Sequence, residues 1–144
     1  MARATLTRRV GFSATHRYHR PEWSEARNRE AFGDCAAPEP HGHAYVCDVS
    51  VRGAVDATTG TVMDLGVLDR ILTAEVISPL HGTCVNDAYP EFAPGGRIPT
   101  CEELAGAIAA RVNRALADAG VDARATAVRV AEDDTLSATW TPDP

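Results

Sequence analysis

Apolar and polar residues alternate along two stretches near the N-terminus, and this alternation predicts two β-strands. In residues 6–16 it places Phe12 and His16 on one face, because successive side chains of a strand point to opposite sides. In residues 43–52 it places His43 on the same face as the apolar odd-numbered positions. Both histidine-bearing faces are therefore expected to face the core.

Two later stretches have the period of a helix instead. Asp64 is a plausible N-cap for a helix that continues to about Ile77 and is closed by Pro79. Residues 100–103 form a capping box for a second helix, which Gly120 ends. The apolar stripes are Leu65, Leu68, Ile71, Leu72 and Val76 in the first helix, and Leu104, Ile108, Val112 and Leu116 in the second.

The remaining segments complete the order of elements. Residues 125–131 and 136–140 are strand candidates separated by an acidic turn at 132–134. Residues 17–40 form a long connection rich in Arg, Glu and Pro, and long structureless connections are usually functional. We predict one domain over residues 1–144, with an α+β fold of order β-β-α-α-β-β and two helices on one face of an antiparallel sheet.

Composition narrows the class of protein. The 44% of hydrophobic residues among 144 suits one compact core, and a net charge of −6 argues against a nucleic-acid-binding surface. No apolar run approaches the roughly 20 residues of a membrane span, and the basic N-terminus leads into no apolar signal segment. A cytoplasmic protein with neither nucleic acid nor membrane as partner is therefore expected.

All 14 basic residues are arginines, so reactions that need a lysine are excluded. These are Schiff-base chemistry, pyridoxal phosphate attachment and the lysine of a Walker-type phosphate loop. The four cysteines form no CxxC pair, which favours free thiols over disulfides.

The sequence His41-Gly42-His43 is the first candidate for chemistry. Histidines two apart on an extended segment point the same way, and neutral imidazole is a favoured zinc ligand. His16 is the natural third ligand, since antiparallel pairing of the two strands brings it opposite the other two. The alternative is that these are ordinary surface or core histidines with hydrogen-bond partners.

Cys35 lies in the long connection, six residues before His41. A thiol near a divalent cation is pushed towards thiolate, which can act as a general base or a nucleophile. The alternative is a small buried hydrophobe, and Cys47 and Cys101 fit that description. His19 is interpreted as a loop residue or an anion contact.

Motifs in order along nearly the whole chain resemble the 6-pyruvoyl-tetrahydropterin synthase and 6-carboxytetrahydropterin synthase family. The five-residue spacer between Cys35 and His41 looks like the animal-type pyruvoyl enzymes. The matching segments are Phe12-Ser-Ala-Thr-His16, Asn28-x3-Phe32-Gly33-x-Cys35-x5-His41-Gly42-His43-x-Tyr45, Thr59-Gly60-x-Val62-Met63-Asp64, Pro99-Thr100-x-Glu102-x-Leu104-Ala105 and Glu132.

The resemblance implies a tunnelling fold, in which subunits assemble into a trimeric barrel and two trimers stack as a hexamer, with active sites between subunits. It implies Zn²⁺ held by His16, His41 and His43, with Cys35 as general base. It also implies that Glu132 anchors a pterin ring. A carboxylate just past a strand does suit a guanidine-like donor pair, although a turn acid is the structural alternative.

Thr100 and Glu102 match a segment that lines the pterin pocket in the family, but their capping role explains them equally well. The implied activity is a zinc-dependent lyase that converts 7,8-dihydroneopterin triphosphate to a 6-pyruvoyl- or 6-carboxy-tetrahydropterin. Arginines have to meet the triphosphate. Those available in the long connection are Arg17, Arg20, Arg27 and Arg29.

The chain departs from the family at Leu80-His81-Gly82, where an Asp-His pair that activates the cysteine of the adjoining subunit is incomplete. Catalytic His81 is therefore a hypothesis. Asp87 could supply the carboxylate from another point, or Cys84 a second thiol.

Three interpretations remain open: an active synthase, a relative repurposed for zinc-assisted cleavage or elimination on another substrate, and a zinc or pterin-binding module without catalysis. Cys35 bound to the metal favours the last of these, because structural zinc sites are closed by four protein ligands.

Overall fold

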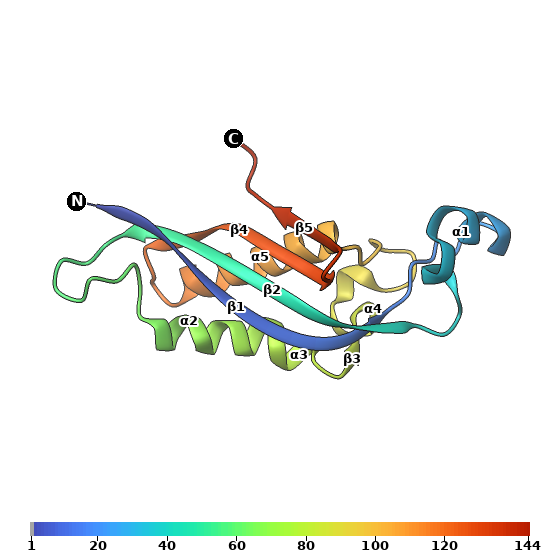
Figure 1. The fold of residues 1–144 in the computed structure, drawn as a ribbon, viewed down its shortest axis with the longest axis horizontal. Helices are drawn as coiled ribbons and strands as arrows, with labels where there is room; N and C mark the ends of the chain where they lie inside the picture. The colour runs from blue at the N-terminus through green and yellow to red at the C-terminus, as the bar shows by residue number, and fades with distance from the viewer. Residues whose placement is uncertain (1) are drawn as a thin grey trace.

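Five strands form one sheet in the order β3-β1-β2-β4-β5 (Figure 1). The computed structural model describes residues 2–144. The four longer strands pair antiparallel, and the two-residue β3 pairs parallel with β1. The strands are β1 (Arg3–His16), β2 (His41–Ala54), β3 (Thr83–Cys84), β4 (Ala123–Asp133) and β5 (Leu136–Trp140).

The predicted α+β class and its four strands are confirmed, and β1, β2 and β4 extend beyond the predicted bounds. The acidic turn is shorter than predicted, because β4 runs on to Asp133. Strand β3 was not predicted, since two residues carry no periodic signal.

The helices include the two predicted ones and several short ones. They are α1 (Glu25–Phe32), α2 (Leu65–Leu72), α3 (Ser78–Leu80), α4 (Val85–Ala88) and α5 (Cys101–Asp118), with 3₁₀ turns η1 (Gly33–Ala36) and η3 (Pro90–Phe92) and a π turn η2 (Thr73–Ile77). Helix α5 packs on β4 and β5, and α2 contacts α5. The core lies between these helices and one face of the sheet, and its fully buried residues include Val49, Leu68, Leu104, Ile108 and Val128.

The connection 17–40 is not structureless, which corrects the sequence interpretation. Ser24 caps α1 by accepting a hydrogen bond from the Arg27 N–H at 3.1 Å. The buried Asn28 side chain accepts from the Arg20 N–H at 2.7 Å and donates to the Arg20 carbonyl at 2.9 Å. This polar anchor replaces the apolar stripe by which a helix is usually recognised. Helix α1 lies at the opposite end of the long axis from the N-terminus (Figure 1).

Pro79 does not close the helix before it, which is a second correction. Helical structure continues through η2 and α3 to Leu80. Proline has no N–H to donate to the carbonyl four residues earlier, that of Glu75. The hydroxyl of Tyr89 donates to that carbonyl at 2.6 Å, so the carbonyl keeps a partner.

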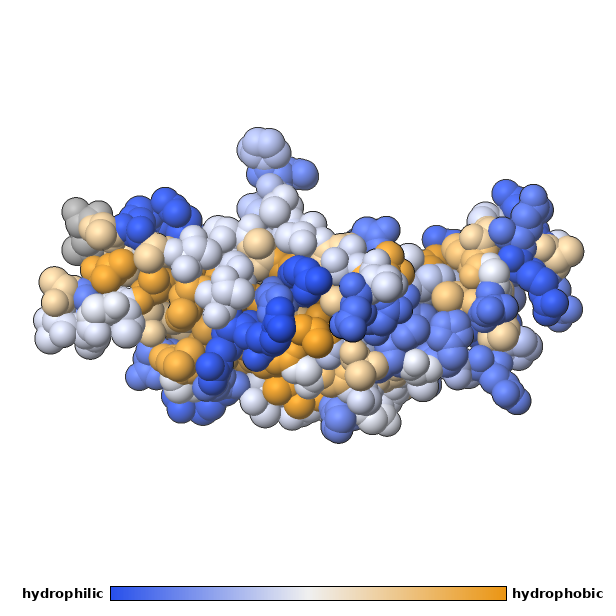
Figure 2. All heavy atoms as spheres, in the orientation of Figure 1, coloured by the Kyte–Doolittle hydropathy of each residue, from blue (hydrophilic) through white to orange (hydrophobic). Residues whose placement is uncertain are grey.

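The face of the sheet turned away from the helices carries charged side chains beside apolar ones such as Val46. Asp48 accepts two hydrogen bonds from Arg9, at 2.7 and 3.1 Å, and lies 3.6 Å from Arg129. In Figure 2, hydrophilic residues lie near the middle of the visible face, with hydrophobic residues around them.

Among residues 2–144, no helix combines the length and the apolar character needed to cross a bilayer.

Candidate active site and metal centre

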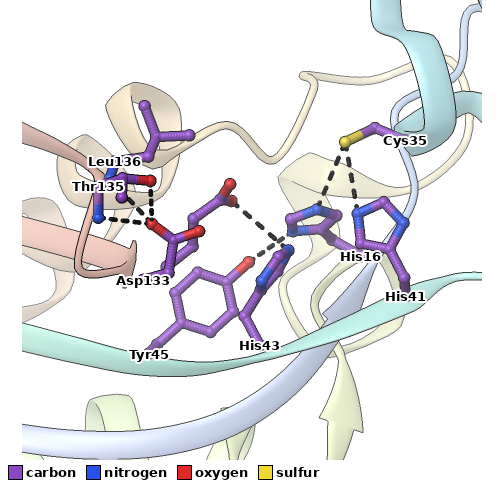
Figure 3. Close-up of polar contacts among 9 residues, drawn as sticks. His16, Cys35, His41, His43, Tyr45, Asp133, Thr135 and Leu136 are labelled. Carbon is purple, nitrogen blue, oxygen red and sulfur yellow. Dashed lines mark hydrogen bonds and ion pairs between the residues drawn. The ribbon is translucent and has the colours of Figure 1, made fainter.

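Strand register brings three imidazoles together at one end of the sheet. His16 is the antiparallel partner of His41, and Ala14 is the partner of His43. The alternation turns all three rings to the helix side of the sheet, and one ring nitrogen from each lies within 4.8 Å of the others (Figure 3). The predicted convergence of His16, His41 and His43 is present in the structure.

His16 is held in the form that binds metals. Its side chain is fully buried, and burial, followed by the neighbouring His43 and His41, lowers its pKa to about 4. It is therefore neutral at pH 7. Its Nδ1 is hydrogen-bonded to the Tyr45 hydroxyl, which leaves Nε2 directed towards Cys35. Such a partner on the second ring nitrogen is a common way to orient a metal-binding imidazole.

Two of the three buried side-chain polar atoms that lack a hydrogen-bond partner among residues 2–144 lie here, namely His43 Nε2 and Glu132 Oε2. They lie 3.8 Å apart. Buried polar atoms without a partner are rare and call for a ligand, water or ion. A cation bound by the three imidazoles would occupy the position that His43 Nε2 faces, so the donor set fits a divalent transition metal.

Cys35 is positioned beside two of the imidazoles. Its Sγ lies 3.4 Å from His41 Nε2 and 4.0 Å from His16 Nε2. The Tyr18 N–H donates to the Cys35 carbonyl at 2.8 Å, which ties η1 to the end of β1. Burial and the charges of Glu132 and Asp34 raise the pKa of the thiol. The protein's own charges thus oppose thiolate formation, and a bound cation would act in the other direction.

The two acidic residues at the end of β4 have different surroundings. Asp133 accepts hydrogen bonds from the Thr135 N–H and hydroxyl, both at 2.7 Å, and from the Leu136 N–H at 3.0 Å (Figure 3). These bonds lower its pKa. Asp133 is the turn acid, whereas the Glu132 side chain is only 10% exposed and lies beside His43.

Sequence reasoning assigned no role in the site to two tyrosines. The alternation put Tyr45 on the same face as His43, but the hydrogen bond of its hydroxyl to His16 was not predicted. Tyr18 stacks on His16 with ring centroids 4.6 Å apart, and burial and the charges of Glu132 and Cys35 raise its pKa. Nothing in the local pattern after the end of β1 indicates that Tyr18 turns back onto His16.

The N-terminus of α5 borders the same region. Thr100 accepts a hydrogen bond from the Glu103 N–H at 3.2 Å, as expected of an N-cap. Burial, followed by the charge of Glu132, raises the pKa of Cys101 to about 11. Glu102 is exposed, and its charge contributes to the raised pKa of Tyr18.

His81 lies apart from the histidine cluster. Its Nδ1 accepts a hydrogen bond from the Ser13 N–H at 3.1 Å, and its side chain is exposed. Ser13 precedes His16 by three residues, about 10 Å along a strand. The Cys84 thiol lies 3.6 Å from Asn86 Oδ1 and does not join the cluster.

Known proteins resemble this chain in sequence and in fold. A family model described as 6-pyruvoyl tetrahydropterin synthase matches residues 5–143. The chain belongs to this family. The family resemblance is thereby confirmed, and the subunit has the α+β fold that it implied.

Several relatives are similar over most of the chain. The 6-pyruvoyl tetrahydrobiopterin synthase of Poecilia reticulata is 38% identical over 100 residues, covering 69% of this chain and 67% of that protein. The Homo sapiens protein of the same name is 37% identical over 90 residues, 62% of each. The alignments thus span about two thirds of these relatives' length. The solved structure of Caenorhabditis elegans 6-pyruvoyl tetrahydropterin synthase superposes with a TM-score of 0.88 at 29% identity, covering 99% of this chain and 98% of that chain.

Proposed function

We propose that this protein is a zinc-dependent lyase of tetrahydropterin synthesis that acts on 7,8-dihydroneopterin triphosphate and releases triphosphate. The observation that carries the proposal is the convergence of three imidazole nitrogens beside a thiol, with an unpartnered buried carboxylate next to them. The relatives named above support the 6-pyruvoyl product over the 6-carboxy product.

In this proposal His16, His41 and His43 hold Zn²⁺. The bound ion would polarise the side-chain hydroxyls of the substrate and make the adjacent C–H more acidic. The Cys35 thiolate takes up the proton from that carbon, because its sulfur lies on the side of the cluster formed by His16 and His41.

Glu132 would hold the pterin ring. Its carboxylate is buried and has no hydrogen-bond donor among residues 2–144, so it is available to the amino and ring N–H groups of the pterin. Thr100 and Glu102 are assigned to the edge of the same pocket, since they flank Cys101, whose pKa is raised first by burial and then by the charge of Glu132.

His81 is assigned to the site of a second copy, because within one subunit its ring is bonded to β1 at Ser13 rather than to Cys35. This role of His81 requires an assembly of copies, such as a trimer or hexamer. Strand β5 is an edge strand, and β3 covers β1 only at Ala14 and Thr15, so the long edge of β1 and the short edge of β5 are available for pairing between copies.

The test is to incubate the zinc-loaded protein with 7,8-dihydroneopterin triphosphate and to identify the products by mass. Release of triphosphate with a 6-pyruvoyl product is expected, and no release over hours refutes the proposal. Cys35→Ala should keep zinc and lose turnover. Cys47→Ala is the matched control and should keep both, because Cys47 is a fully buried core residue of β2.

Replacing zinc by cobalt separates a catalytic centre from a closed structural site. If Cys35 is a ligand, the cobalt protein has a thiolate charge-transfer band that Cys35→Ala removes. The absence of that band in the resting protein agrees with an open coordination position and a free base. A new product without triphosphate release would favour the repurposed relative, which the altered Leu80-His81-Gly82 segment also supports.

A further inference from the structure

A cavity of about 210 Å³ includes Arg17, His19 and Arg97 in its wall. A smaller cavity of about 80 Å³ shares Arg17 and His19 and adds Arg29. Both are lined by the chain that leaves the end of β1. Neither the metal ligands nor Glu132 belong to their walls.

Arg17 is held in place by its backbone, while its guanidinium remains largely free. Its N–H donates to Asn86 Oδ1 and its carbonyl accepts from Asn86 Nδ2, both at 2.9 Å. Its Nε donates to the Ala36 carbonyl at 3.3 Å. The other four of the five guanidinium N–H groups have no hydrogen bond within residues 2–144, and no carboxylate there lies within 4.0 Å.

His19 presents a second unused group at the same place. Its Nδ1 is buried and has no hydrogen-bond partner in the part of the chain that the structure describes. Asp87 in the larger cavity and Glu25 in the smaller one are the carboxylates of these walls, and neither pairs with Arg17. The larger wall carries two arginines and one carboxylate. Arg97 already lies 3.8 Å from Glu103, so among residues 2–144 Arg17 is the arginine of this wall without a carboxylate partner, which favours an anion.

Other arginines of the same segment are already engaged. Arg20 donates to the Gly96 carbonyl at 2.8 Å. The Arg27 guanidinium lies over the Trp23 ring, 4.2 Å from its centroid. The structure thus separates Arg17 from Arg20 and Arg27, which the sequence alone could not rank, while Arg29 stays available in the wall of the smaller cavity.

We infer that Arg17 and His19 bind the phosphate end of the substrate. The inference rests on the proposed function, which supplies a substrate with a terminal triphosphate. The Arg17 Nε donates to the carbonyl of Ala36, the residue after Cys35. A substrate whose reacting C–H faces the Cys35 thiol would therefore extend its side chain towards the Arg17 guanidinium. The planar fork of free N–H groups suits phosphate oxygens, and His19 adds one ring nitrogen.

The experiment compares a phosphorylated ligand with a phosphate-free one. Zinc-loaded Cys35→Ala protein is titrated with 7,8-dihydroneopterin triphosphate and with 7,8-dihydroneopterin, alone and combined with Arg17→Gln or His19→Gln. Each added substitution should lower the affinity for 7,8-dihydroneopterin triphosphate about tenfold or more, as expected for the loss of charge-assisted hydrogen bonds. The phosphate-free ligand and the zinc content should not change. Arg27→Gln is the matched control and should alter neither affinity.

A second titration uses inorganic triphosphate with excess magnesium, which keeps zinc on the protein, and tests the anion site without a pterin. Weaker binding in both Arg17→Gln and His19→Gln supports the inference even if no turnover is found, in which case only the proposed function fails. Unchanged binding in both variants, or no binding to the unaltered protein, overturns the inference. Arg17→Lys keeps the charge but not the planar fork of donors. If Arg17→Gln perturbs the Cys35 segment, Arg17→Lys is the test variant, and its affinity for triphosphate should be lower than that of the unaltered protein.

Discussion

Replacing Glu132 by Gln tests whether this carboxylate serves binding or folding. The side chain is 10% exposed, and its Oε2 has no hydrogen-bond partner among residues 2–144. The nearest cationic candidate, His43 Nε2, lies 3.8 Å away, which is too far for a hydrogen bond. Glu132→Gln therefore removes a buried charge without breaking a bond. We expect the free energy of unfolding to stay unchanged or to rise by up to about 1 kcal/mol.

The same substitution should be costly for catalysis. A neutral amide in place of the carboxylate loses charge-assisted hydrogen bonds to the pterin N–H groups, and such bonds contribute about 1.5–3 kcal/mol. The expected decrease in kcat/KM is about 10- to 150-fold. Triphosphate release gives kcat/KM, and urea unfolding followed by tryptophan fluorescence gives stability, at one fixed protein concentration because assembly changes apparent stability.

Asp133→Asn is the matched control. It weakens the hydrogen bonds to Thr135 and Leu136, so it should lower stability and leave kcat/KM unchanged. The reasoning is refuted if Glu132→Gln destabilises the fold while kcat/KM stays at the level of the unaltered protein, because Glu132 would then be the structural acid.

Two further predictions concern stability. Tyr89→Phe leaves the Glu75 carbonyl without its donor and should lower the free energy of unfolding in urea by about 1–3 kcal/mol. Adding Pro79→Ala supplies a backbone N–H to the same carbonyl and should recover part of that loss. If the effects of the two substitutions are simply additive, the explanation is wrong. Glu91 accepts two bonds from Arg111, at 2.6 and 2.7 Å, which lower its pKa, so the pair stabilises the fold above the unfolded pKa of about 4.3 and stops doing so as pH falls through the lowered folded value. Glu91→Gln should thus cost about 1 kcal/mol at pH 7 and progressively less below pH 5, whereas a cost independent of pH would exclude this mechanism.

The parts of the fold that could be predicted from the sequence are those with a periodic apolar pattern. The alternation in β1 and β2 placed His16 and His43 on the core side, and antiparallel pairing then required them to converge. Helix α5 was predictable because its cap at Thr100 and its apolar stripe agree.

The parts that escaped prediction depend on contacts between distant residues. Helix α1 is organised around the buried amide of Asn28 instead of an apolar face. Pro79 ends a helix in an isolated sequence, but a tyrosine hydroxyl ten residues later satisfies the carbonyl that proline leaves free. The different surroundings of Glu132 and Asp133 follow from where β4 ends, and the pattern misplaced that end by two residues.

The pairing of His16 with His41 distributes the candidate metal ligands over both strands of one β-ribbon. A one-residue slip between β1 and β2 would turn His41 and His43 to the face opposite His16. A metal ion held by all three rings would therefore fix the register of the two strands at the end where the connection 17–40 joins them. Removal of the metal ion by a chelator should let the two strands separate at this end, while their other half stays paired.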